Sequence, residues 1–258
     1  MSFRNIIFYS TFFLSLFLFS CKPEVEDYST EPLSDFLPLI PGKYITYRLD
    51  STVFPNAGRS TEIHSYQEKN VVDEQITDNL GRPGYRIFRY LRDTAGLKPW
   101  TSAGTYLITP LQNSIEVFDN NMRTVRLVTP IAEGTTWKGN HFLADDPYHS
   151  LYNFTSVDNN DIGEWEYRYG AITSEVIGGK SYNEVLTVYH SDEMQNIKNN
   201  QPNLTDVFAS RTLSLDKYAK SVGMVYQERI MWEYQPNVTG PSPYKTGFGV
   251  KRTLIDHN

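Results

Sequence analysis

Apolar and polar residues alternate along most of this chain, which is the pattern of half-buried β-strands. The alternation is clearest at residues 44–50, 85–92, 122–128, 165–169, 182–189 and 223–232. Turn sequences rich in Asp, Asn and Gly lie at residues 78–81, 119–121, 158–163 and 178–179. Short strands joined by tight turns predict an all-β fold with a curled antiparallel sheet. Only residues 191–200 have the composition of a helical turn.

A faint repeat divides the alternating part of the chain. Residues 38–42 and 130–134 have similar sequences, and an aromatic side chain, Tyr44 or Trp137, follows each within three residues. Residues 71–93 likewise parallel residues 172–192. The repeat predicts two tandem related β units, a first unit at 37–129 and a second at 130–258, which are compatible with one continuous domain.

The amino terminus has a different pattern. Arg4 precedes an apolar run at residues 6–19, which is too short to span a bilayer comfortably but has the length of a signal-peptide core. The run ends next to Cys21, which is the single cysteine of the chain. Residues 1–20 resemble a bacterial lipoprotein signal, which is cut before a cysteine whose sulfur receives a lipid that carries acyl chains such as palmitate. Phe19 is bulkier than the residue usual there, and an ordinary secretory signal is the alternative.

Residues 21–36 predict an acidic, flexible tether, because they carry prolines and acids and few apolar side chains. The acidic cluster behind Cys21 also resembles a surface-export signal of Bacteroidota lipoproteins, and a plain solvated linker is the alternative. The three acyl chains of a mature lipoprotein would anchor the protein durably. We therefore expect a lipid-anchored outer-membrane protein, with the cell surface favoured over the periplasmic face.

The net charge limits the partners. The chain carries 24 basic and 30 acidic side chains, a net charge of −6, and removal of residues 1–20 takes away Arg4 and leaves −7. A mildly acidic protein argues against nucleic acid as a partner, since such binding needs clustered Lys and Arg. With a single cysteine, no disulfide can form within the chain.

Two stretches carry a resemblance to a known group. The sequence PLIPGKY at 38–44 and the sequence YAKSVGMVYQE at 218–228 are similar to motifs of a widespread group of uncharacterised Bacteroidota lipoproteins. Ser221 stands where members often have glycine. The resemblance implies a curled antiparallel sheet, a half-barrel reminiscent of lipocalin or lipoprotein-carrier folds. It implies no activity and no catalytic residues.

One short stretch has metal-ligand residue types. His141, Asp145, Asp146 and His149 lie within nine residues, and imidazole with carboxylate is a donor set for a divalent cation. Their spacing matches no established motif, so a polar surface loop is the alternative. No cofactor is predicted.

Aromatic and hydroxyl side chains give two further candidates. Trp100, Trp137, Trp165 and Trp232 could stack on a sugar or line an apolar pocket, and filling of the core is the alternative. Ser51 and Thr94 lie in Asp-Ser-Thr and Asp-Thr-Ala sequences, which resemble the O-glycosylation signal of Bacteroidota.

Two functions fit the sequence. The first is a membrane-anchored envelope lipoprotein with a non-catalytic role, which binds an apolar ligand, a glycan or another envelope protein. The second is a surface hydrolase of polysaccharide or peptide, which needs two carboxylates or a His-carboxylate set in one cleft. The first is favoured, because the chain has neither a G-x-S-x-G nucleophile elbow nor a phosphate-binding glycine loop.

Overall fold

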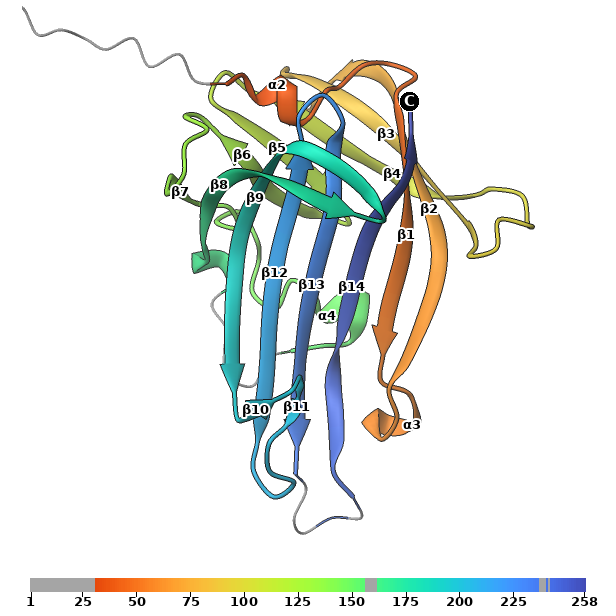
Figure 1. The fold of residues 1–258 in the computed structure, drawn as a ribbon, viewed down its shortest axis with the longest axis vertical. Helices are drawn as coiled ribbons and strands as arrows, with labels where there is room; N and C mark the ends of the chain where they lie inside the picture. Colours follow the sequence, from red (N-terminus) through yellow and green to blue (C-terminus); the bar gives the residue numbers. More distant parts are fainter. Residues whose placement is uncertain (1–30, 156–161, 237–239, 241) are drawn as a thin grey trace, which may run out of the picture.

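A computed structural model describes residues 31–155, 162–236, 240 and 242–258, and strands dominate it (Figure 1). The helical segments are α2 (Leu33–Phe36), α3 (Pro55–Gly58), α4 (His149–Tyr152) and the 3₁₀ turn η2 (Ile162–Glu164). The strands are β1 (Tyr44–Val53), β2 (Glu62–Thr77), β3 (Pro83–Asp93), β4 (Thr101–Pro110), β5 (Ser114–Asp119), β6 (Met122–Val128), β7 (Thr136–Lys138), β8 (Glu166–Ile177), β9 (Lys180–Gln195), β10 (Ile197–Lys198), β11 (Gln201–Pro202), β12 (Ala209–Ala219), β13 (Gly223–Gln235) and β14 (Tyr244–His257). None of the described helices is long and apolar enough to cross a membrane.

All strands except β10 and β11 belong to one antiparallel sheet of 12 strands, in the order β6-β5-β4-β3-β2-β1-β14-β13-β12-β9-β8-β7. The first predicted unit supplies β1–β6 and the second supplies the rest. The two halves meet where β1 pairs with β14, for example at Leu49 and Arg252. The predicted all-β fold with a curled antiparallel sheet is confirmed, and the two predicted units share one sheet. Their relationship as a repeat stays a prediction.

The tightest hairpins have the turn chemistry that the sequence predicts. Asn120 and Asn121 between β5 and β6 have positive φ values of 50° and 62°. Gly178 and Gly179 between β8 and β9 have values of 59° and 81°. Two consecutive residues with positive φ match the right-handed twist of a hairpin, and Asn and Gly adopt this conformation at the lowest cost.

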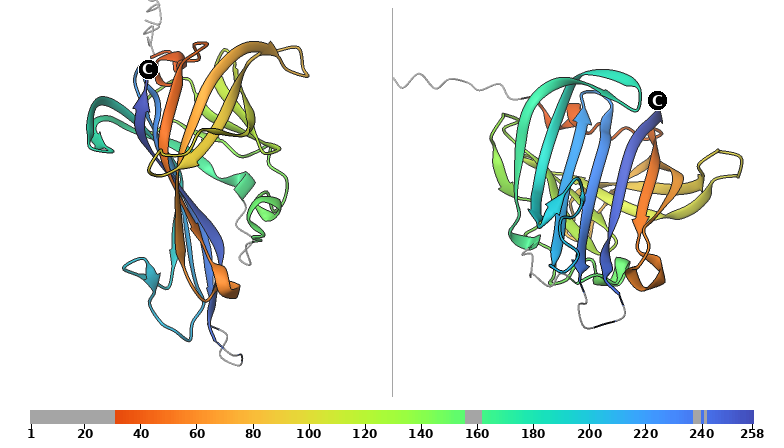
Figure 2. Two further views of the ribbon diagram at one scale, coloured as in Figure 1. Left: turned by 90° about the vertical axis from the view of Figure 1, so that its right-hand side faces the viewer. Right: turned by 60° about the horizontal axis from the view of Figure 1, so that its bottom comes forward.

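The sheet curls until its two edge strands touch (Figure 2). Backbone N–H of Val125 in β6 donates to the carbonyl of Gly139, just after β7, at 2.8 Å. The indole Nε1 of Trp137 in β7 donates to the carbonyl of Val125 at 2.9 Å. The concave side holds the main core. Tyr148 and Phe154, from the segment that joins β7 to β8, pack edge-to-face there against Phe248 of β14.

The segment before β1 crosses one end of the curled sheet. α2 buries Leu33 and Phe36 in the main core. Backbone N–H of Ser221, in the turn between β12 and β13, donates to the carbonyl of Asp35 at 2.6 Å. The described end of the predicted 21–36 tether therefore packs onto the sheet. Residues 1–20 and Cys21 lie outside the described residues.

The predicted helical turn at residues 191–200 is wrong. β9 continues through this region to Gln195 and pairs with β12, with Ser191 opposite Ser214 and Gln195 opposite Ser210. The short hairpin of β10 and β11 follows. Local helix propensity is a weak preference, and pairing with a neighbouring strand overrides it here.

Candidate functional site

The concave side of the sheet encloses a cavity of about 120 Å³. Residues 37–39, before β1, and residues 222–224, at the start of β13, are among those that line it. Apolar side chains from neighbouring strands form one wall, among them Val72, Ile87, Ile108 and Val117. An apolar cavity of about 150 Å³ takes up benzene. At about four fifths of that volume, the cavity is close in size to a single aromatic ring.

Charged side chains line the rest of the cavity, and each acid has an arginine partner. Arg252 holds Glu68 through two hydrogen bonds of 2.9 Å, from Nε to Oε1 and from Nη2 to Oε2. Arg126 Nη1 lies 3.0 Å from Asp216 Oδ2, and Arg89 Nη2 lies 2.6 Å from Asp119 Oδ2. The three acids and the three arginines therefore form three matched ion pairs around the cavity.

Gln227 connects two of these pairs. Its Nε2 donates to Asp216 Oδ1 at 2.8 Å, and its Oε1 accepts from Arg252 Nη1 at 2.6 Å. Burial alone would raise the pKa of Glu68, but Arg252 and Arg89 hold it below the ordinary value. Burial would likewise raise the pKa of Asp216, yet His190, Arg126 and Arg229 hold it at about 2. Both acids are therefore ionised at neutral pH.

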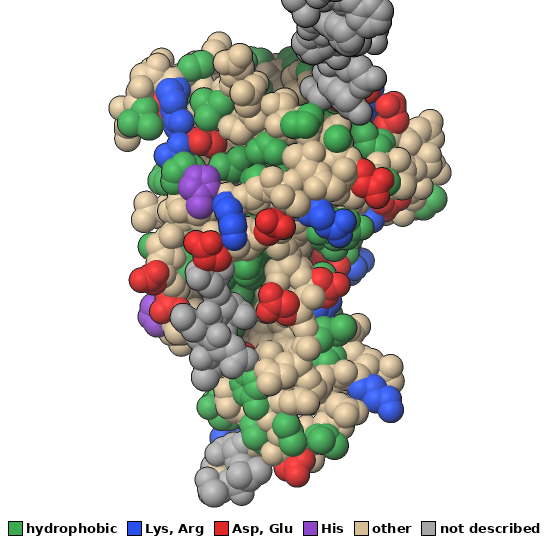
Figure 3. Space-filling view, turned by 90° about the vertical axis from the view of Figure 1, so that its left-hand side faces the viewer, with side chains coloured by type: hydrophobic (Ala, Val, Ile, Leu, Met, Phe, Trp, Pro, Cys, Tyr) green, Lys and Arg blue, Asp and Glu red, His purple; other side chains and the backbone are tan. Residues whose placement is uncertain are grey.

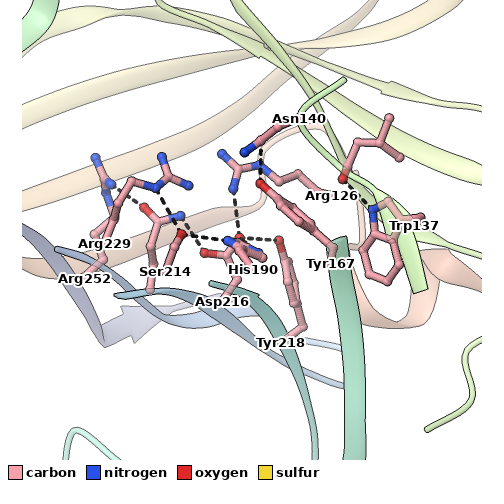
Figure 4. Close-up of polar contacts among 12 residues, drawn as sticks. Arg126, Trp137, Asn140, Tyr167, His190, Ser214, Asp216, Tyr218, Arg229 and Arg252 are labelled. Carbon is pink, nitrogen blue, oxygen red and sulfur yellow. Dashed lines mark hydrogen bonds and ion pairs between the residues drawn. The ribbon is translucent and has the colours of Figure 1, made fainter. Parts of the chain in front are cut away.

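A second part of the network lies deeper in the protein (Figure 4). His190 Nδ1 lies 2.9 Å from Ser214 Oγ, and His190 Nε2 lies 3.7 Å from Asp216 Oδ2. The imidazole stacks on the ring of Tyr167 with centroids 3.8 Å apart, and Tyr167 donates its hydroxyl proton to Asn140 Oδ1 at 2.7 Å. Burial lowers the pKa of His190 to about 3, so that the imidazole is neutral at pH 7.

A β-bulge aims His190 at this network. Ser191 and Tyr189 pair with the consecutive residues Ser214 and Leu215, so that His190 is the extra residue of β9. A bulge turns one side chain out of the regular alternation. Here it directs an imidazole toward the side chains of β12.

Ser214, His190 and Asp216 are residue types of acyl-transfer enzymes, but their burial opposes catalysis. The side chain of His190 is 0% exposed, Ser214 is 1% exposed, and neither lines the cavity. Glu68 and Asp216 do line the cavity, and their pKa values lie below the ordinary value, whereas a general acid at neutral pH needs a raised one. These side chains therefore lack the exposure or the raised pKa that acid-base hydrolysis requires.

The four tryptophans do not form one platform, and none of them lines the cavity. Trp165 belongs to the main core, and the partly buried Trp137 packs against it. Trp232 belongs to a separate cluster with Ala209 and Tyr234. Trp100 lies just before β4, where the guanidinium of Arg92 covers its ring at 4.2 Å. Their role in ligand binding stays a prediction.

The four residues with metal-ligand types lie around two surface grooves. His141 lines one of them, and its Nδ1 lies 2.5 Å from the carbonyl of Lys138. Asp145, Asp146 and His149 line the other. In the part of the chain that the structure describes, no three His, Cys, Asp or Glu side chains gather in a way that could hold a metal ion. The geometry gives the metal hypothesis no support.

The remaining sequence candidates lie at strand ends. Ser51 is in β1, opposite His64 of β2, and Thr94 follows β3. The hydroxyl of Thr94 donates to the carbonyl of Ser65 at 2.6 Å. Modification of Ser51 and Thr94, like lipidation of Cys21, stays a prediction. On the face shown in Figure 3, acidic and basic side chains are interspersed.

Sequence reasoning missed the buried network. In β12 the residues that share the concave face are polar, namely Thr212, Ser214 and Asp216, while Leu213 and Leu215 lie on the other face. Polar side chains at every second position, next to leucines, are the signal in the sequence. Read by itself, that signal places the leucines inside.

Comparisons with known proteins give no family. No protein-family model matches the chain, and a search of curated proteins finds no match. Among solved structures, it is similar to a Bacteroides fragilis protein whose description gives it a YmcC-like fold and suggests export. The identity is 10% and the TM-score 0.37, over 86% of this chain and 99% of that one. A DUF1329 family protein from Desulfovibrio piger is similar with 11% identity and a TM-score of 0.20, over 84% and 85%. Similarities of this strength carry no argument about function.

Proposed function

We propose that this chain is a lipid-anchored envelope protein of the outer membrane whose curled sheet binds a small ligand without catalysis. The observation that carries the proposal is the cavity on the concave side, with an apolar wall and a lining of paired charges. Ligand sites are typically concave, mostly apolar and equipped with a few fixed polar groups. The lipoprotein-like signal ending at Cys21 supports the anchor.

Uptake of a neutral, ring-sized probe tests the binding role. Fluorobenzene added to the purified protein should show saturable broadening of its ¹⁹F NMR signal, because it matches the size of the cavity. Ile108→Phe should weaken this uptake at least tenfold, since Ile108 lines the cavity and a larger ring fills it. Ile115→Phe is the matched control, because Ile115 is equally buried in the same core but does not line the cavity.

The two variants distinguish loss of the cavity from a general loss of stability. Overpacking lowers the free energy of unfolding by about 1–3 kcal/mol at either position, so both variants should be destabilised to a similar extent. Uptake that survives in Ile115→Phe and is lost in Ile108→Phe supports a ligand-binding cavity. No saturable uptake by the wild type, or equal loss in both variants, rejects it.

A further inference from the structure

Two polar atoms in the wall of the cavity have no hydrogen-bond partner among the described residues: Asn70 Oδ1 and Arg89 Nε. Both atoms are buried. The other groups of the two side chains are engaged. Asn70 Nδ2 donates to Glu68 Oε1 at 2.9 Å, and the terminal nitrogens of Arg89 bond to Asp119. Arg89 Nε lies 3.9 Å from Glu68 Oε1, too far for a hydrogen bond.

The register of the sheet makes these two residues neighbours. Asn70 of β2 lies directly opposite Arg89 of β3. The Cβ atoms of directly opposed residues are about 4.5–5.5 Å apart, and their side chains point to the same face. The two side chains therefore leave the same face of the sheet side by side, where a single polar group can lie between them. Such a group must accept a hydrogen bond from Arg89 Nε and donate one to Asn70 Oδ1, which a hydroxyl does.

The charges around the cavity favour a neutral group over an ion. The three acids and three arginines already form three matched pairs. A cation, or an anion out of reach of Lys43, would have to break one of these pairs or remain uncompensated, and either costs free energy. Lys43 also lines the cavity; its side chain is partly exposed to solvent, and its Nζ donates to the carbonyls of Asn258 at 3.0 Å and Ser221 at 3.4 Å.

We infer that the cavity binds a neutral amphiphile: an apolar body of ring size against Ile87 and Ile108, and a hydroxyl group between Asn70 Oδ1 and Arg89 Nε. This inference rests on the proposed binding function and names its ligand class. It predicts selection by the polar end of the ligand rather than by the apolar end.

Four probes with the same ring test the selection. They are 4-fluorotoluene, 4-fluorobenzyl alcohol, 4-fluorobenzoate and 4-fluorobenzylammonium, titrated by ¹⁹F NMR at pH 7. The alcohol should bind about threefold or more tighter than 4-fluorotoluene, because a net hydrogen bond contributes about 0.5–1.5 kcal/mol. It should bind roughly tenfold tighter than either ion, because an uncompensated charge is costly in the cavity.

A substitution at Asn70 assigns the contact. Asn70→Ala removes the acceptor, so the variant should bind the alcohol and 4-fluorotoluene about equally tightly. Its affinity for 4-fluorotoluene should match that of the wild type. The retained binding of 4-fluorotoluene shows that the variant is folded. Asn183→Ala, at an exposed position of β9, is the matched control and should keep the full preference.

Each other outcome overturns the inference. Equal binding of the alcohol and 4-fluorotoluene by the wild type means that water alone satisfies the two atoms. Tighter binding of 4-fluorobenzoate means that Lys43 or an opened arginine pair recognises an anion. If the protein binds 4-fluorotoluene and 4-fluorobenzyl alcohol equally tightly, the inferred ligand class is wrong but the proposed binding function stands. If none of the four probes binds, the proposed function itself fails.

Discussion

The buried imidazole of His190 should make the protein less stable at mildly acidic pH. Burial, together with the charges of Arg126 and Arg229, lowers the pKa of His190 from 6.5 to about 3, although Asp216 opposes the shift. Between pH 6.5 and pH 3 the unfolded chain therefore binds a proton at this residue that the folded chain does not. Stability must rise with pH across this window and fall as the pH is lowered through it.

The size of the effect follows from the same pKa values. Each pH unit in this window changes the free energy of unfolding by about 1.4 kcal/mol. From pH 6 to pH 4, His190 alone should lower the free energy of unfolding by about 2–3 kcal/mol, because it is already partly protonated in the unfolded chain at pH 6. Carboxylates add to the total loss, so the contribution of His190 has to be isolated by comparison with a variant.

Urea unfolding of the wild type and of His190→Gln at pH 6, 5 and 4 isolates the contribution of His190 to the pH dependence. Glutamine does not titrate, and its amide can still bond to Ser214 Oγ. The wild type should lose about 2–3 kcal/mol more than the variant between pH 6 and pH 4. His64→Gln is the control for replacing a histidine outside the buried network, since the side chain of His64 is 49% exposed.

Two results would refute this reasoning. One is a pH dependence of His190→Gln that is identical to that of the wild type. The other is an NMR titration of the folded wild type in which the imidazole of His190 protonates above pH 6. Either would mean that the ring is solvated or that Asp216 dominates its environment.

Three further predictions concern the sheet and the anchor. Glu68→Gln should destabilise the protein by about 3–5 kcal/mol in urea unfolding, because it leaves Arg252 buried without its acid, and replacing both residues with Met should recover most of the loss. Gly247→Ala should cost about 3 kcal/mol, since its Cβ would lie 2.1 Å from a backbone oxygen at φ +122°, whereas Gly42→Ala, with open space at φ +86°, should cost about 1 kcal/mol. Cys21→Ala should abolish palmitate labelling and move the protein from the membrane fraction to the soluble fraction, and unchanged partitioning would reject the anchor.

Period-two alternation located the strands well where one face is apolar and the other is solvated. The run predicted at residues 122–128 coincides with β6, and the run at 85–92 lies inside β3. The hairpin signals at residues 119–121 and 178–179 also hold, because positive φ values are a local property that Asn and Gly satisfy. The segment 191–200 could not be assigned locally, since its strand conformation depends on β12, which is distant in sequence.

The candidate site could not be predicted because the rule that locates strands gives the wrong face for β12. Alternation places Leu213 and Leu215 inside, yet Ser214 and Asp216 face the concave side. Burying Asp216 is tolerated because Arg126 arrives from β6, on the other half of the sheet, 90 residues away along the chain. A buried acid costs several kcal/mol without such a partner, and the sequence does not show which arginine the curling of the sheet will bring to it. Curling of the sheet thus brings Arg126 to Asp216 and shapes the cavity that this pair lines, so the proposed binding site is a property of the curl and not of any single strand.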